Sequence, residues 1–291
     1  MANSDTGAAL GIDVGFSERS RSTAFCLLLW DRDSICLRTR RTKTDAAARR
    51  RTLADLVSPD LPALAVALDG PLTHGFALIQ HYRAAEALLS QGVFQRRGKP
   101  GQTSSPTGLR LHEHATALAQ LVLEAEAAGQ CRLLPAGHAE PVHESAIVEA
   151  FPNQFLASLL PEAALPQLRR NASDLHWQAC VNLGRFPVLL DCLLPGRALQ
   201  TPLSTYVGHD DRAAIVCALT ALSVVAGDGV GVGDAVDGDI MLPPPGCWGA
   251  AMDAADPWME RALRFSLTTL RERHPRWRAA RITHRGRKWI S

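Results

Sequence analysis

Three short β-favouring runs stand near the start of this 291-residue chain, and no helical pattern separates them. They span residues 10–14, 23–30 and 34–39, and polar, turn-like segments join them. Strands that follow one another through such connections tend to pair antiparallel. The pattern therefore predicts a three-strand antiparallel meander at the start of the fold.

The next segments alternate between helical and strand patterns. We predict a helix over residues 45–57, a strand over 63–68, a strand over 146–151 and a strand over 239–242. The clearest helical pattern covers residues 206–226. Three antiparallel strands followed by helix, strand and further helices and strands is the order of the RNase H-like fold. We therefore predict an α/β protein with a mixed sheet flanked by helices.

Two further segments complete the predicted organisation. The main domain covers residues 8–245 and carries a helical insertion at about 71–135, with helices near 76–89 and 111–128. Residues 246–291 form a basic helical extension in which Trp258, Trp277 and Trp289 stand among many arginines. This extension fits a nucleic-acid contact through charge and stacking, and it fits packing on the domain or a partner subunit equally well.

The composition is that of an ordinary soluble protein. Hydrophobic residues make up 46%, and the formal net charge of +2 does not by itself indicate a polyanionic partner. The seven cysteines contain no C-x-x-C pair, which is typical of free thiols in a reducing compartment. The start of the chain lacks a signal-peptide pattern, and no apolar run is long enough to cross a bilayer. We expect a cytoplasmic protein without a membrane contact.

An aspartate interrupts the first apolar strand. An isolated carboxylate in the protein interior costs several kcal/mol, roughly the stability margin of a domain, unless a metal, a cation or a hydrogen-bond network pairs with it. In the predicted topology the first and fourth strands are neighbours, so Asp13 and Asp69 face one another. Asp210 and Asp211, in the first turn of the late helix, are the candidates for a third group.

Converging carboxylates repel one another unless a divalent cation sits between them. Hard oxygen ligands select Mg²⁺ or Mn²⁺. Two such ions about 3.5–4 Å apart clamp a phosphodiester, one activating water and the other stabilising the leaving oxygen. The pattern thus predicts a metal site made by Asp13, Asp69 and either Asp210 or Asp211.

Each acidic residue also has a simpler interpretation. Asp13 and Asp69 suit turns, and Asp210 and Asp211 suit any helix N-terminus. Glu149, on the fifth strand, is either a member of the acidic site, a partly exposed strand residue or an ion-pair partner.

His209 and a cluster of basic residues are the remaining candidates for functional residues. His209 adjoins the predicted acidic helix, where it either orients a ligand or serves only the fold. Basic residues also gather near the third strand and first helix, where they could neutralise phosphates or form a solvated face. This cluster consists of Arg38, Arg40, Arg41, Lys43, Arg49, Arg50 and Arg51.

Five segments resemble one family when taken in order. LGIDVG, VALDGPL, IVEAFP, HDDRAAIVCALTAL and GDAVDGDIMLPP, within residues 8–245, are similar to the family called domain of unknown function 429, whose members are predicted RNase H-like nucleases. The resemblance implies that Asp13, Asp69, Glu149 and an aspartate of the HDD segment form an acidic site. The family pattern often has aspartate where this chain has Ala213, so Asp210 or Asp211 would supply that carboxylate.

The expected function is therefore a divalent-metal-dependent nuclease acting on DNA or RNA. One alternative is a nucleic-acid-binding or regulatory protein that keeps the scaffold but has lost a metal ligand. A more distant alternative is a phosphotransferase of the actin and sugar-kinase type. That class needs a Gly-rich phosphate turn after a second aspartate strand, where this chain has Asp69-Gly-Pro-Leu.

Overall fold

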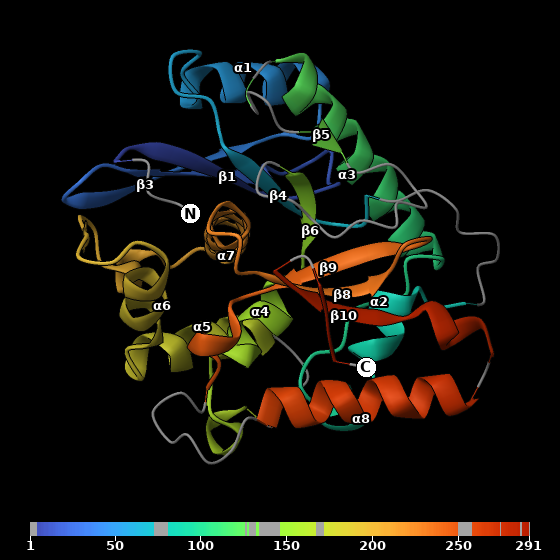
Figure 1. The fold of residues 1–291 in the computed structure, drawn as a ribbon. Helices are drawn as coiled ribbons and strands as arrows, with labels where there is room; N and C mark the ends of the chain where they lie inside the picture. The colour runs from blue at the N-terminus through green and yellow to red at the C-terminus, as the bar shows by residue number, and fades with distance from the viewer. Residues whose placement is uncertain are drawn as a thin grey trace.

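The computed structural model describes residues 5–72, 81–125, 127, 132–133, 146–166, 172–249, 258–273, 275–285 and 287–290. Their strands form one mixed sheet with helices on its faces, which confirms the predicted α/β class (Figure 1). The strands are β1 (Gly7–Asp13), β2 (Thr23–Trp30), β3 (Ser34–Thr42), β4 (Ala65–Asp69), β5 (Arg132–Leu133), β6 (Ala146–Ala150), β7 (Ala198–Leu199), β8 (Val230–Asp234), β9 (Gly238–Leu242), β10 (Arg281–His284) and β11 (Arg287–Ile290).

The helices vary widely in length. The α-helices are α1 (Ala46–Leu56), α2 (Ala84–Leu88), α3 (Pro106–Glu124), α4 (Pro152–Ser158), α5 (Ala172–Asn182), α6 (Arg185–Leu193), α7 (His209–Val225) and α8 (Trp258–Arg273). Short 3₁₀ turns are η1 (Gly92–Arg96), η2 (Glu162–Ala164), η3 (Leu203–Thr205), η4 (Pro245–Cys247) and η5 (Pro275–Ala279).

The strand order explains how distant acidic residues meet. It runs β11-β10-β8-β9-β6-β4-β1-β2-β3-β7, with β5 beside β6. β1, β2 and β3 pair antiparallel, as predicted, whereas β4 pairs parallel with both β1 and β6. Because parallel strands run in the same direction, the carboxyl ends of β1, β4 and β6 lie at one edge of the sheet.

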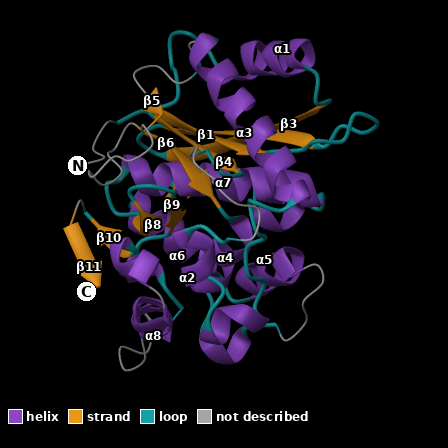
Figure 2. Cartoon of the chain, turned by 90° about the vertical axis from the view of Figure 1, so that its right-hand side faces the viewer, coloured by secondary structure: helices purple, strands orange, loops and turns teal. Residues whose placement is uncertain are grey.

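Two apolar layers cover the two faces of this sheet. Ala9, Ala67 and Val148 face a core that includes the buried side of α7. Their neighbours along the strands, Leu10 and Val66 among them, face a second core formed with α1 and α3. Figures 1 and 2 show α1 and α3 on one side of the central strands and α7 on the other. The alternation is the period of two expected for a strand buried on both faces.

The starts of the helices follow local signals. The Asp45 side chain accepts a hydrogen bond from Ala48 N at 2.8 Å and caps α1, which begins one residue after the predicted start. α3 begins at Pro106, five residues before the predicted start, because Ser105 caps it and proline suits the first helical position. The helix predicted over 76–89 is found only as α2, and residues 73–80 lie outside the described part of the chain.

The C-terminal segment is only partly helical. α8 matches the prediction, but the expectation of a helical extension is wrong for residues 281–290, which form β10 and β11. β10 pairs antiparallel with β8, so the chain beyond residue 246 contributes to the same sheet. Trp258 and Trp277 are buried in the core, which removes them as stacking surfaces.

β8 contains Gly231 and Gly233, and the sequence pattern predicted no strand there. Glycine is uncommon in strands because it adds no side-chain packing. Here a Cβ on Gly231 would lie 2.7 Å from Thr283 Oγ1, across the β8–β10 pair. The glycine therefore serves close strand packing, a reason that becomes visible only when the C-terminal strand is in place.

Candidate active site

Asp13 and Asp69 stand side by side at the carboxyl ends of β1 and β4. They are register partners in the parallel pair, so their side chains leave the sheet on the same face. Both residues are only partly buried, unlike the apolar residues that precede them. The structure thus brings together the two acidic residues whose proximity followed from the predicted strand order.

Residues level with Asp13 and Asp69 on the neighbouring strands form a row across the sheet. Across β2 and β3 the register aligns Asp13 with Ala24 and then with Arg41. On the other side Asp69 is level with Ala150 of β6. Two acidic side chains and one basic side chain therefore share the α7 face, with Ala24 between Asp13 and Arg41 and Ala150 on the far side of Asp69.

The electrostatics of the pair oppose ionisation. Burial raises the pKa of Asp13 well above its ordinary value, and the charges of Asp69 and Asp210 raise it further. Burial, with the charge of Glu149, raises the pKa of Asp69 to about 7. Among the residues that the structure describes, no hydrogen bond or ion pair reaches either carboxylate. The charge of Arg41 lowers the pKa of Asp13, but burial and the neighbouring carboxylates raise it by more, so the protonated form is favoured.

Helix α7 brings the third predicted group to this row. Gly11 lets the helix lie directly on β1, since a Cβ there would stand 2.0 Å from Ala218 N and 2.2 Å from Ala214 O. Asp210 and Asp211 lie in the first turn of α7, where the helix dipole favours negative charge. Their charges reach Asp13 and raise its pKa, so the predicted convergence holds electrostatically.

Arg41 holds both helix aspartates. Its Nε and Nη2 donate to Asp211 Oδ1 and Oδ2 at 2.9 and 2.8 Å, the two-pronged geometry that suits guanidinium and carboxylate. Its Nη1 lies 3.5 Å from Asp210 Oδ2. Sequence analysis placed Arg41 only in a general basic cluster, because its partner lies 170 residues further along the chain.

Glu149 does not join the pair on the α7 face. In β6 it is level with Leu68, the residue before Asp69, so its side chain leaves the sheet on the opposite face. On that face Glu149 forms an ion pair with Arg83, with Nη1–Oε2 and Nη2–Oε1 distances of 2.7 and 2.5 Å. Of the three interpretations of Glu149, the structure supports that of an ion-pair partner.

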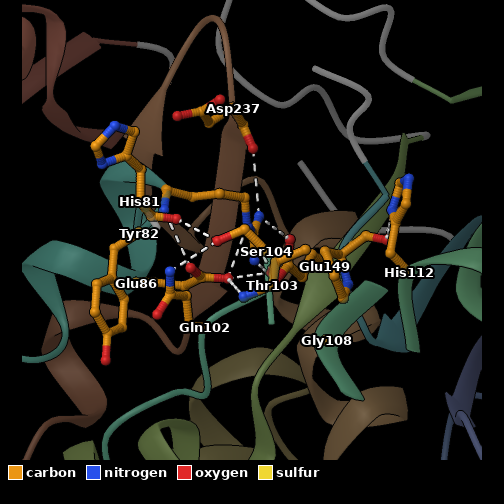
Figure 3. A network of polar contacts seen from close by, with 12 residues as sticks. His81, Tyr82, Glu86, Gln102, Thr103, Ser104, Gly108, His112, Glu149 and Asp237 are labelled. Carbon is orange, nitrogen blue, oxygen red and sulfur yellow. Dashed lines mark hydrogen bonds and ion pairs between the residues drawn. The ribbon is translucent and has the colours of Figure 1, made fainter. Parts of the chain in front are cut away.

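Arg83 is the centre of a buried polar network (Figure 3). Its Nε donates to Glu86 Oε1 and to Thr103 Oγ1, both at 3.0 Å, and its Nη1 reaches the carbonyl of Asp237 at 3.3 Å. The backbone N–H and hydroxyl of Thr103 also donate to Glu86. The network fastens the segments around α2 and the start of α3 to β6. No sequence signal indicated Arg83, whose contact with Glu149 spans 66 residues.

His209 lies apart from the acidic pair. Its ring is largely exposed, and its Nδ1 is 3.1 Å from Asp174 Oδ2. Arg212 donates to the other oxygen of the same carboxylate at 3.0 Å. The contacts of His209 therefore tie α7 to α5, and they do not direct the ring at Asp13 or Asp69.

An aromatic and basic group borders the loops that follow the two aspartates. Phe16 comes three residues after Asp13, with exposed Arg110 5.3 Å above its ring and the His114 ring 6.3 Å away. The same part of α3 touches the corner after Asp69, where a Cβ on Gly70 would lie 2.8 Å from the Ala115 side chain. A cation and aromatic rings thus border the loop after Asp13, and the helix that carries Arg110 and His114 contacts the corner after Asp69.

The donor chemistry of Asp13 and Asp69 suits a hard divalent cation. Mg²⁺ prefers oxygen ligands, and it often takes only one or two carboxylates from the protein while water and substrate phosphate complete its shell. Within the described ranges, no three His, Cys, Asp or Glu side chains are arranged to hold a metal ion together. The residues therefore fit a cation held by the pair alone, with Asp210 and Asp211 occupied by Arg41.

Comparisons of the chain with protein-family models, curated proteins and solved structures found no match. In the part of the chain that the structure describes, no helix is long and apolar enough to cross a membrane.

Proposed function

We propose that the chain is a divalent-metal-dependent nuclease built on an RNase H-like fold. The order β3-β2-β1-β4-β6, with an antiparallel meander followed by two parallel strands, supports that fold. The observation that carries the function is the Asp13–Asp69 pair, because two neighbouring carboxylates without a cation or donor partner are costly to keep unless a ligand uses them.

The chemistry assigned to the site follows from its residues. A bound Mg²⁺ or Mn²⁺ supplies Lewis-acid polarisation of a phosphoryl oxygen and a more acidic water. Asp13 and Asp69 would hold the cation, and their shared face fixes where it lies. α7 closes one side of the site, and its acidic first turn keeps the local potential favourable to cations.

Nucleic acid is the substrate class that the surroundings favour. Arg110 is exposed and can neutralise a phosphate, while Phe16 and His114 offer rings on which a base can stack. Phe16 lies in the loop after β1, while His114 and Arg110 belong to α3, which also contacts the corner after Asp69. A strand bound to these side chains would follow the carboxyl ends of β1 and β4, the edge of the sheet at which Asp13 and Asp69 stand.

The test is cleavage of labelled single-stranded, duplex, hybrid and branched DNA and RNA with Mn²⁺ present. We expect the wild type to cut at least one substrate and Asp13→Asn to cut none. Asp60→Asn, at an exposed position, is the matched control and should cut like the wild type. Asp13→Asn should also fold as well as the wild type or better, since it removes like-charge repulsion.

A second function is favoured by one observation. Arg41 already neutralises Asp210 and Asp211, which is the arrangement expected if the scaffold binds nucleic acid without cutting it. Retention of a labelled strand with no cleavage by either wild type or Asp13→Asn would favour that role. Full cleavage by Asp13→Asn would contradict the proposed nuclease.

A further inference from the structure

Arg41 forms the most complete ion pair at the candidate site. Three of its atoms contact the carboxylates of Asp210 and Asp211, and the two carboxylates have side-chain exposures of 28% and 25% against 35% for the guanidinium. All three side chains are thus partly exposed to solvent. The partners are therefore accessible to an incoming ion.

The backbone around this ion pair is shaped to admit the guanidinium. Gly208 is the residue before α7, and a Cβ on it would lie 1.8 Å from Arg41 Nη2 and 2.8 Å from Asp211 Oδ2. The φ of Gly208 is −77°, a conformation open to any residue, so the backbone itself does not require glycine. The missing side chain is explained by the space that Arg41 occupies.

The charges in this row do not balance with Arg41 alone. The charges of Asp69, Asp210 and Asp211 act on Asp13, and Arg41 is the cation that directly contacts Asp210 and Asp211. Removal of Arg41 would leave two neighbouring carboxylates at the start of α7 without their counter-ion. The added negative charge would favour a divalent cation at this end of the sheet.

We propose that Arg41 is a resident counter-ion that competes with a divalent cation for Asp210 and Asp211 and thereby sets the metal affinity of the site. This inference rests on the proposed metal-dependent function and assigns a positioning residue to it. When Arg41 pairs with the aspartates, Asp13 and Asp69 are the only carboxylates of the row left to a cation. When the guanidinium leaves, the two helix carboxylates become available as well.

The test is calorimetric titration with Mn²⁺ near neutral pH of five chains: the wild type, Arg41→Gln, Gly208→Ala, Arg40→Gln and Asp13→Asn. Arg41→Gln removes the positive charge that pairs with Asp210 and Asp211. Gly208→Ala keeps Arg41 and its charge, but the added Cβ would occupy the space of the Arg41 guanidinium. Arg40→Gln is the matched control, because Arg40 is exposed, contacts the carbonyl of Thr39, and alternates onto the opposite face of β3.

We expect Arg41→Gln and Gly208→Ala each to lower the Mn²⁺ dissociation constant by about fivefold or more, the change that loss of one competing partly exposed ion pair allows. Arg40→Gln should change it by less than about twofold. Thermal denaturation supplies an independent readout. Without metal, Arg41→Gln should melt at a lower temperature than the wild type. Added Mn²⁺ should raise the melting midpoint of Arg41→Gln by more than it raises that of the wild type.

Unchanged or weaker Mn²⁺ binding in both site variants would overturn the role of Arg41. An equal gain in Arg40→Gln would overturn it too, because the effect would then be one of net charge. If the wild-type binding depends on Asp13 but neither variant alters it, only this inference fails. If no chain, including the wild type, binds Mn²⁺ in an Asp13-dependent way, the proposed function fails with it.

Discussion

The surroundings of Asp69 strongly alter its acid–base behaviour. Aspartate in an unfolded chain titrates near 4, whereas burial and the charge of Glu149 raise the pKa of Asp69 to about 7. Between these values the folded chain binds the extra proton. The free energy of unfolding contributed by this group therefore falls as the pH rises from about 4 to about 7.

Asp69→Asn should remove that pH dependence. Relative to the wild type, the variant should gain stability steadily as the pH is raised through this window, because asparagine has no proton to lose. Urea denaturation of both chains at several pH values measures the difference, with Asp60→Asn as an exposed control. A stability difference that stays constant from about pH 4 to about pH 7 would contradict the shifted pKa.

Arg83 lies with its carboxylate partners in the interior, so its removal leaves buried charge uncompensated. Arg83→Met should lower the free energy of unfolding by about 3–5 kcal/mol, and adding Glu149→Gln to it should restore part of the loss. Arg50→Met, which breaks the exposed pair with Glu124, should cost less than about 1 kcal/mol. Equal losses from the buried and exposed pairs, measured by urea denaturation, would contradict this description of the network.

At the scale of single residues, sequence predicted positions better than partners. Asp13 and Asp69 followed from strand order, because neighbouring parallel strands bring their ends together. The partners of Glu149 and Asp211 did not follow, because each ion pair joins residues far apart in the chain and depends on the assembled sheet. Local pattern carries no information about such contacts.

Among elements, the contact of α7 with β1 decides where the acidic turn lies. Gly11 makes this contact close, since any side chain there would meet the helix backbone. Gly11→Ala should cost about 1–3 kcal/mol of stability through overpacking and should weaken Mn²⁺ binding by displacing α7. At Gly101 an added Cβ would meet no atom within 4 Å, so Gly101→Ala should leave stability and Mn²⁺ binding unchanged. Wild-type stability in Gly11→Ala would show that the helix is not fixed by this contact.

Elements with strong local signals were predicted well. The antiparallel meander and α7 had clear apolar patterns, and α1 had its Asp45 cap. β8 was missed because its glycines weaken strand propensity, and β10 and β11 were missed because arginines and a tryptophan resembled a continuing basic helix. These strands form because an existing sheet edge accepts them, which is a tertiary effect.

Over the whole molecule, the C-terminal segment and the N-terminal strands belong to one hydrogen-bonded sheet. Ile282 of β10 is fully buried against this sheet. We expect one cooperative unfolding transition, which Ile282→Ala should shift as a unit at a cost of about 2–5 kcal/mol. The exposed control Lys288→Ala should move it little. Two separate unfolding transitions, of which Ile282→Ala shifts only one, would indicate that the chain beyond residue 246 unfolds independently of the main domain.

The proposed function depends on the paired ends of β1 and β4. The most direct test is titration of the wild-type chain and of Asp13→Asn with Mn²⁺ in a calorimeter. The account predicts saturable binding by the wild type and a loss of at least about tenfold in affinity for Asp13→Asn, since one of two carboxylate ligands is gone. Identical binding by the two chains, or no saturable binding by the wild type, would contradict a metal site at Asp13 and Asp69.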